Sequence, residues 1–261
     1  NSNNITLRNI IIDIGCSPLV NFHLHDFSDK GFYMDIDRNK SPFYVEDKSI
    51  VFERENRLCF GKDRILALHA IGRYNVQYFT MGEKEVDPNT LPAPLMKCDI
   101  EETASGVYAK YRADSPCHCI FKNETVSSII DGDRDVDAIC LNRSSEIDIV
   151  NVTVSRAIGM VVIGQLSNTI RIDSFSTDTS SHKGHQPLTA DSLHFVNCDG
   201  ILEIKNCNIS DTMDDAINVH GMYTVLSSKD RGVLNAKIMH REQHFFNPYR
   251  EADRLEIIDN I

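Results

Sequence analysis

Three short segments of this chain share one alternating pattern, and this repeat limits the fold more than any other feature. In residues 147–151, 170–174 and 202–206 apolar side chains alternate with polar ones, and each segment ends on Asn or Ser. A period of two is typical of β-strands. The segments start 23 and then 32 residues apart, and a spacing in the low twenties is typical of stacked solenoid coils. We therefore predict an all-β chain built as a right-handed parallel β-helix.

The pattern also divides the chain into predicted domains. Because the alternation already occurs near the N-terminus, residues 1–42 are expected to form the first coils, and residues 140–223 the coils that carry the site. Between them, in residues 43–139, the repeat lapses and turn residues crowd together. We interpret this stretch as an inserted β-barrel or β-sandwich module. Residues 224–261 are expected to begin a further β module or to be a truncated end.

Charge and hydropathy exclude several classes of partner. The chain has 261 residues and a net charge of −11, which disfavours nucleic acid and anionic membranes because both attract basic surfaces. It also disfavours a polyanionic substrate, whereas a neutral sugar is unaffected. No apolar run is long enough to span a bilayer. The chain lacks an initiator Met, so we expect a processed or trimmed product; the sequence does not define its oligomeric state.

Three carboxylates lie in two later segments, residues 190–195 and 214–219. When the apolar positions of these segments are aligned as inward-facing strand residues, Asp191 falls on Asp215, 24 residues later. Asp214 adds a third carboxylate one position earlier. Neighbouring strands lie about 4.8 Å apart, so the three side chains are expected to be close neighbours.

Such a cluster suits glycoside hydrolysis, which needs one protonated carboxyl as acid and one ionised carboxylate as base. We expect one of the three groups to have a raised pKa, because adjacent carboxylates resist ionising together. The plain alternative is that Asp214 and Asp215 form an ordinary turn and bond local amides. The matching position of Asp191 on the preceding coil favours the catalytic interpretation.

Residues 190–193 (Ala-Asp-Ser-Leu), followed by residues 214–221 (Asp-Asp-Ala-Ile-Asn-Val-His-Gly), resemble glycoside hydrolase family 110. The resemblance implies an exo-acting, inverting α-galactosidase that cleaves terminal α-1,3-linked galactose, including the blood-group B determinant. It also implies a β-helix with inserted β-barrels, in a periplasmic or secreted bacterial protein. The close match covers these two segments, and the remainder agrees in architecture alone.

The resemblance assigns the three family carboxylates to Asp191, Asp214 and Asp215. The same layout looks like that of the polygalacturonases. By that analogy Asp214 is the general acid, while Asp191 and Asp215 hold and activate the water, although acid and base could be exchanged. This chemistry rests on carboxylates, so we expect neither a metal nor an organic cofactor.

Other polar residues near the motif are candidates for substrate binding. His194 and Asn218 are expected to share the outer face of adjacent coils, where they could bond sugar hydroxyls. His220 follows the motif, and His185 lies in a polar loop that could rim the pocket. Outward polar residues of a β-helix are otherwise simply solvated.

Two rival functions start from the same fold. A polygalacturonase-like hydrolase of uronic-acid chains would need Arg or Lys beside the groove to hold substrate carboxylates, and residues 191–221 offer Lys205 alone. A non-catalytic glycan-binding β-helix would bind through aromatic platforms, but the chain has no Trp, and the alternation turns Phe175 and Phe195 inward. Neither argument decides between linear and branched α-1,3-galactosides.

Overall fold

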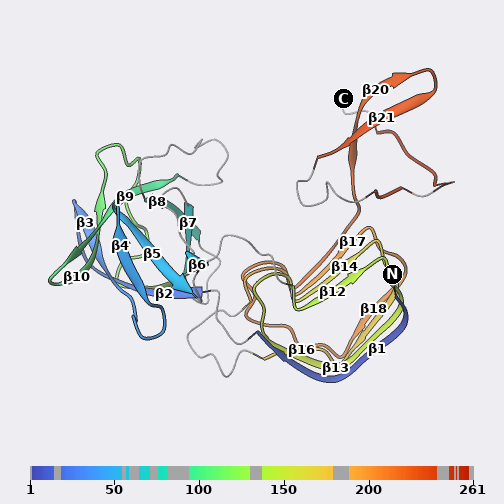
Figure 1. Cartoon of the computed structure of the whole chain (residues 1–261), viewed down its shortest axis with the longest axis horizontal. Helices are drawn as coiled ribbons and strands as arrows, with labels where there is room; N and C mark the ends of the chain where they lie inside the picture. Colours follow the sequence, from blue (N-terminus) through green and yellow to red (C-terminus); the bar gives the residue numbers. More distant parts are fainter. Residues whose placement is uncertain are drawn as a thin grey trace.

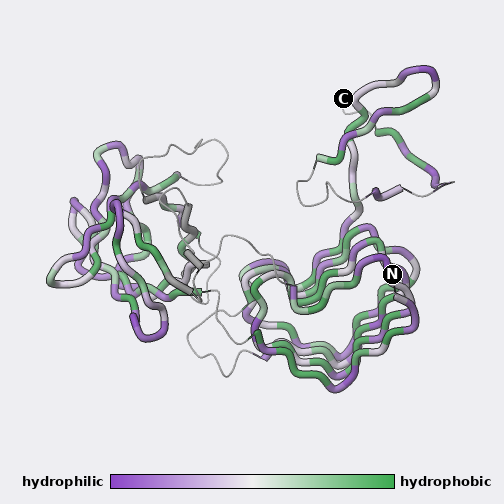
Figure 2. Tube along the Cα trace, in the orientation of Figure 1, coloured by the Kyte–Doolittle hydropathy of each residue, from purple (hydrophilic) through white to green (hydrophobic). Residues whose placement is uncertain are grey.

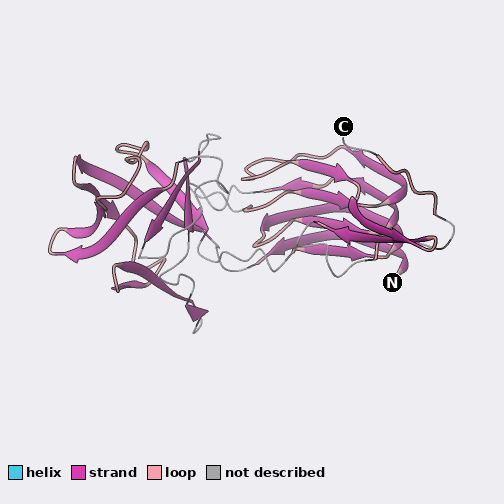
Figure 3. Cartoon of the chain, turned by 90° about the horizontal axis from the view of Figure 1, so that it is seen from above, coloured by secondary structure: helices cyan, strands magenta, loops and turns pink. Residues whose placement is uncertain are grey.

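The computed structural model describes residues 2–14, 19–54, 57–58, 65–70, 76–81, 94–129, 137–178, 188–239, 247–249, 251 and 253–258. Every regular element in these residues is a β-strand, as Figure 3 shows. The prediction of an all-β chain is therefore confirmed for the described part. None of the described segments forms a helix long and apolar enough to cross a membrane.

Two parallel sheets make up one region of the molecule (Figure 1). The first sheet contains, in spatial order, β1 (Asn3–Asp13), β13 (Ser145–Arg156), β15 (Asn168–Asp173) and β18 (Asp199–Lys205), with β16 (Ser176–Thr177) also paired to β13. The second contains β12 (Ile139–Asn142), β14 (Val162–Gln165), β17 (Leu193–Val196) and β19 (Ile217–His220). From β12 onward the chain visits the two sheets in turn. We call one pass through both sheets a coil.

The register of the first sheet follows the sequence repeat. Leu7 lies opposite Ile149, Ile149 opposite Ile172, and Ile172 opposite Ile204. Figure 2 shows hydrophobic positions lining up from one strand to the next in this way. The N-terminal segment is therefore a neighbour of the later repeats, as the alternation predicted. These apolar rows form the core between the two sheets.

The polar residue that ends each repeat has a conformational reason. Asn9, Asn151, Ser174 and Asn206 have φ values of 56°, 50°, 57° and 55°. Most side chains disfavour this left-handed region, whereas Asn tolerates it because its short polar side chain can bond locally. The side chains also bond between coils, since Asn151 Nδ2 donates to Asn9 Oδ1 at 2.7 Å. Each coil thus turns a corner at the same position.

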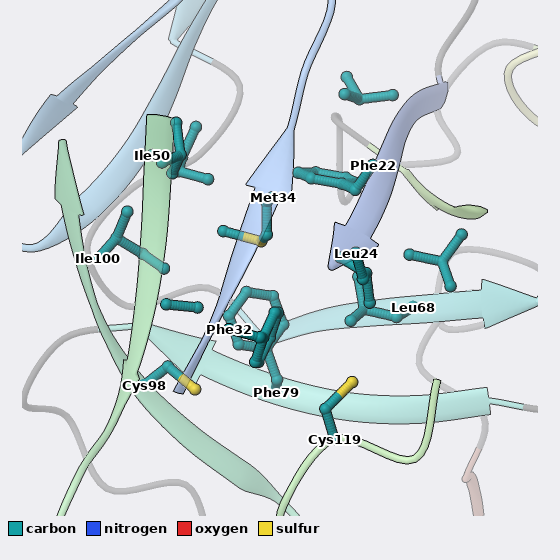
Figure 4. Packing of buried hydrophobic residues seen from close by; sticks show 14 of the residues in the cluster. Phe22, Leu24, Phe32, Met34, Ile50, Leu68, Phe79, Cys98, Ile100 and Cys119 are labelled. Carbon is teal, nitrogen blue, oxygen red and sulfur yellow. The ribbon is translucent and has the colours of Figure 1, made fainter. Parts of the chain in front are cut away.

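The second region is a closed barrel. Its neighbouring strands are antiparallel, except for β8 and β9, which pair in parallel. In sequence order the barrel strands are β2 (Leu19–Ser28), β3 (Gly31–Asp35), β7 (Ile65–Ala70), β8 (Val76–Met81), β9 (Met96–Thr103), β10 (Gly106–Tyr111) and β11 (Thr125–Ile129). Figure 4 shows its packed interior, where Phe22, Phe32 and Phe79 are fully buried.

The barrel begins earlier in the sequence than we expected. Strands β2 and β3 lie within residues 1–42, which were expected to form coils, yet they pair with β11 and β10 of the barrel. The reason is side-chain alternation, because Phe22, Leu24, Phe32 and Met34 bury one face of each strand in the barrel core. At the other end, β12 joins the parallel sheets from Ile139, close to the expected boundary at residue 140. The division into independent domains stays a prediction.

Two smaller antiparallel units complete the described strands. One sheet contains β4 (Phe43–Glu46), β5 (Ser49–Arg54) and β6 (Arg57–Leu58). The other is a hairpin of β20 (Thr224–Asp230) and β21 (Val233–Ile238), which follows β19. This hairpin lies within residues 224–261, where we expected either the start of a further β module or a truncated end.

Candidate active site

The predicted alignment of the two motif segments is correct. Leu193 of β17 pairs with Ile217 of β19, and His194 pairs with Asn218. One residue before β17, the backbone N–H of Ser192 donates to the carbonyl of Asp215 at 3.0 Å. Asp191 therefore enters its coil directly beside Asp215 of the next coil.

The three predicted carboxylates come together at this entry. Oxygen atoms of Asp191, Asp214 and Asp215 lie within 4.8 Å of one another. The three groups differ in their exposure, since Asp191 is 4% exposed, Asp214 is half-buried and Asp215 is exposed. The cluster thus has one carboxylate fixed inside the protein and two nearer to the solvent.

Asp191 is held by three hydrogen bonds. Its Oδ2 accepts from the ring Nδ1 of His194 at 2.5 Å and from Asn218 Nδ2 at 3.1 Å. Its Oδ1 accepts from the backbone N–H of Asp215 at 3.2 Å. Donors from both coils therefore converge on one buried carboxylate and fix its orientation.

The pKa of Asp191 lies below its ordinary value. Burial raises this pKa, but the hydrogen bonds from His194 and Asn218, the charge of His194 and the Asp215 N–H together hold it below the usual 3.8. Hydrogen bonds to the charged form outweigh the loss of solvation here. The raised pKa that we expected for one member of the cluster is therefore not that of Asp191, whose lowered pKa favours the ionised carboxylate.

Thr212 positions Asp214, and sequence reasoning missed it. Its hydroxyl donates to the carbonyl of Ala190 at 2.8 Å and accepts from the backbone N–H of Asp214 at 3.3 Å. The backbone N–H of Asp215 also donates to Asp214 Oδ1 at 3.2 Å. A Thr two residues before a pair of Asp residues is the available signal, because such hydroxyls often cap turns.

The two histidines of the motif contact each other. His194 Nε2 lies 3.0 Å from His220 Nε2, and the two rings are nearly perpendicular, at 82°. His220 also directs Nδ1 to the carbonyl oxygen of Gly221 at 2.9 Å. A chain of polar contacts thus runs from Gly221 through both rings to Asp191.

The residues predicted for substrate binding therefore have protein partners. His194 and Asn218 share the outer face of adjacent coils, as expected, and both donate to Asp191. His220 contacts His194. Their contact with a sugar stays a prediction. His185 lies outside the described residues.

The donor set at this site fits acid–base chemistry better than metal binding. Three carboxylate oxygens within 4.8 Å could in principle share a cation. However, Asp191 already accepts three hydrogen bonds, which occupy most of the lone pairs that a cation would need. An ionised carboxylate beside two less buried ones is instead suited to hold and activate a water molecule.

The sequence is similar to curated proteins named α-1,3-galactosidase. It is 31% identical over 128 residues to α-1,3-galactosidase B of Phocaeicola vulgatus, which covers 48% of this chain and 21% of that protein. It is 25% identical over 232 residues to α-1,3-galactosidase B of Bacteroides thetaiotaomicron, covering 84% of this chain and 34% of the relative. Identity to α-1,3-galactosidase A of Shewanella woodyi is 26% over 130 residues, covering 49% of this chain and 21% of that protein.

The chain thus spans between about a fifth and a third of the length of these relatives. No family model matches the sequence.

Proposed function

We propose that this chain belongs to an exo-acting glycoside hydrolase that removes terminal α-1,3-linked galactose with inversion. The observation that carries the proposal is the meeting of Asp191, Asp214 and Asp215 where two successive coils begin. The similarity to proteins named α-1,3-galactosidase supports the substrate. The partner is then a glycan with a terminal α-galactose, such as the blood-group B determinant, met in the periplasm or outside the cell.

The roles of the carboxylates follow from their surroundings. Asp191 is ionised and fixed by three hydrogen bonds, which suits a group that orients the attacking water. Asp215 lies beside it on the next coil, and the two carboxylates together hold and activate this water. Asp214, less buried and held by Thr212, is then the acid that protonates the leaving oxygen.

Inversion rests on the resemblance to the family. Acid and base of inverting glycosidases commonly stand roughly 6.5–9.5 Å apart, and those of retaining enzymes about 5–5.5 Å apart. The nearest oxygens of the three carboxylates lie within 4.8 Å, and this spacing alone does not select either outcome. The anomer of the first product is therefore the decisive observation for this part of the proposal.

We also propose that the two parallel sheets form a right-handed parallel β-helix. The chain alternates between the sheets from β12 to β19, and all of these pairs are parallel. In such a helix each coil returns to the same register, which is the condition for stacking Asp191 beside Asp215.

A neutral substrate agrees better with the site than a uronic acid does. Lys205, the one Lys or Arg within residues 191–221, lies on β18 in the other sheet. Its Nζ is 3.4 Å from Glu203 and 3.8 Å from Asp173. It is therefore engaged with carboxylates of the protein, and a substrate carboxylate would face the acidic cluster.

The experiment is to incubate the complete protein with α-1,3-galactobiose and follow the first product by NMR. We expect β-galactose to appear first. Initial α-galactose would replace inversion by retention. Cleavage of a uronic-acid polymer instead of the galactoside would favour the polygalacturonase-like alternative, and binding of the galactoside without turnover would favour the non-catalytic module.

A leaving-group comparison tests the role of Asp214. Asp214→Asn should abolish turnover of galactobiose yet retain activity on an aryl α-galactoside whose leaving group needs no protonation. Equal loss on both substrates would contradict the assignment of Asp214 as the acid.

A further inference from the structure

We infer that Asp191, His194 and His220 together hold one additional proton, beyond those of an ionised carboxylate and two neutral imidazole rings. Through this proton His220 holds His194 in place, and His194 in turn positions Asp191. This inference rests on the proposed function, since it assigns a role to residues beside the same carboxylates. It follows from counting the hydrogen atoms that the contacts of the two rings require.

The count starts at His220. Its Nδ1 lies 2.9 Å from the carbonyl oxygen of Gly221. A carbonyl oxygen can only accept, so this nitrogen must carry a hydrogen. If His220 were neutral, its Nε2 would then present a lone pair.

The same reasoning applies to His194. Its Nδ1 lies 2.5 Å from Asp191 Oδ2, and one hydrogen must lie between them. With the hydrogen on the ring and the ring neutral, Nε2 of His194 would also present a lone pair. Two lone pairs would then meet across the 3.0 Å between the Nε2 atoms of His194 and His220.

The geometry of the rings makes this conflict direct. The ring centroids are 5.0 Å apart, and the Nε2 atoms are 3.0 Å apart. The difference is close to the sum of the two ring radii, as it is when the two nitrogens lie between the centroids. The Nε2 atoms therefore point at each other, and a hydrogen between them is the arrangement that makes the contact favourable. Two neutral rings supply two hydrogens for three contacts, and the third is the additional proton.

The surroundings of the pair are consistent with this charge. Across the sheet, β14 presents Ile163 opposite His194 and Gln165 next to Val196, and neither residue titrates. Asp191 is the acidic group in direct contact with the pair, and Asp214 and Asp215 lie beside Asp191 at the entry to β19. One histidinium thus offsets one carboxylate within the cluster.

Loss of the additional proton should disturb Asp191. Without it the two Nε2 atoms repel, His194 must shift, and Asp191 loses the orientation that its shortest hydrogen bond provides. Activity should therefore fall at alkaline pH as the pair loses its proton. His194 and His220 are positioning residues in this account, and Asp191 is the group that acts on water.

Nuclear magnetic resonance of the imidazole nitrogens in the complete protein tests the proton count without any substrate. At pH 6 we expect three ring N–H groups on His194 and His220 together, with Asp191 ionised and with His220 Nδ1 protonated. Raising the pH should remove one proton from the group. Two neutral rings that stay unchanged from pH 6 to pH 9 would overturn the inference. This readout holds even for a protein that fails to release galactose.

Two variants of His220 test the positioning role. His220→Gln keeps an N–H that can donate to His194 Nε2 but cannot titrate, so turnover should persist and the alkaline fall in kcat should move or vanish. His220→Leu removes the donor, and kcat should drop on the order of 10–100-fold, the effect of losing a hydrogen bond to a charged group, with little change in KM. His23→Gln on the barrel, where His23 is exposed, is the matched control and should resemble the wild type. The positioning role of His220 would be contradicted if kcat fell at the same alkaline pH in the wild type and in His220→Gln. It would also be contradicted if His220→Leu kept the wild-type kcat.

Discussion

The stacked coils and the barrel both bury apolar side chains between their strands, but the partners of their strands follow different rules. In the coils, β17 pairs with β19 and residue 193 meets residue 217. In the barrel, β2 pairs with β11 and residue 19 meets residue 129. From β12 onward, neighbours in the coils are successive repeats, although β1 pairs with the distant β13. In the barrel, by contrast, β2 pairs both with the adjacent β3 and with the distant β11. A repeat makes spatial neighbours predictable from spacing alone.

The two regions also use histidine–carboxylate contacts differently. In the coils, Asp191 is 4% exposed and its contacts come from two successive coils. In the barrel, His25 lies between Asp26 at 3.0 Å and Asp35 at 3.3 Å on the surface. The first arrangement fixes a carboxylate, and the second forms an exposed ion pair. The stacking of successive coils therefore brings polar side chains together around a buried carboxylate, whereas the barrel surface leaves its carboxylates in solvent.

Core truncations should separate the two regions with the largest effect on stability. Phe195 and Phe79 are both fully buried, the first between the sheets and the second in the barrel. Replacement of either by Ala should cost about 3–5 kcal/mol. In calorimetry, each variant should lower the transition of its own region and leave the other in place. A single transition lowered equally by both variants would show that the regions unfold as one unit.

Overpacking of a coil should have a smaller effect. Gly164 of β14 leaves room for the next coil, because a Cβ there would lie 2.8 Å from Cδ1 of Phe195 and 3.2 Å from Cδ1 of Ile170. We expect Gly164→Ala to lower the free energy of unfolding by about 1–3 kcal/mol, measured by urea titration. Gly164→Ala combined with Phe195→Leu should recover part of this loss if the ring is the cause; failure to recover it would point to the backbone instead.

The left-handed corners allow a still finer comparison. Asn151 has a φ of 50°, so Asn151→Ala should destabilise the coils by about 1–2 kcal/mol. Asn151→Gly should cost less, because Gly adopts this conformation without steric penalty. Both variants lose the bond to Asn9, which makes them a matched pair. Equal destabilisation in chemical denaturation would assign the effect to that bond and not to the corner.

The change of stability with pH should have opposite signs in the two regions. It should also be the smallest of the effects on stability that we predict. Burial lowers the pKa of His25, but the contacts with Asp26 and Asp35 prevail and raise it above 6.5. The stabilisation from protonated His25 is therefore complete below pH 6.5 and is lost as the pH rises through the raised value. By contrast, the lowered pKa of Asp191 gives stabilisation that is present above pH 3.8 and lost as the pH falls through the lowered value.

An exposed pair such as that of His25 is worth about 0.2–1 kcal/mol. The midpoint of barrel unfolding should fall slightly between pH 6 and pH 8 in the wild type, and this fall should be absent in His25→Gln. A fall of equal size in both proteins would assign it to another group.

The sequence was most informative where the fold repeats. Alternation in residues 147–151 and 170–174 predicted their register, and alignment of the two Asp segments brought Asp191 to Asp215. Strands β2 and β3 were misplaced because alternation identifies a strand without identifying its partner. The contact between His194 and His220 joins two positions that are diagonal neighbours across the paired strands, so the pairing register alone does not predict it. The pKa of Asp191 depends on the directions of its hydrogen-bond donors, which the sequence pattern does not determine.

The most direct test of the site is a rate comparison of four matched Asp→Asn variants in the complete protein. Asp191→Asn, Asp214→Asn and Asp215→Asn each keep the size of the side chain, and Asp29→Asn makes the same change at an exposed position of the barrel. With α-1,3-galactobiose as substrate, kcat/KM should fall by about 10²–10⁴-fold in each of the first three variants and stay at the wild-type value in Asp29→Asn. Wild-type rates in the three coil variants, with each shown to be folded, would contradict the assignment of this cluster as the active site.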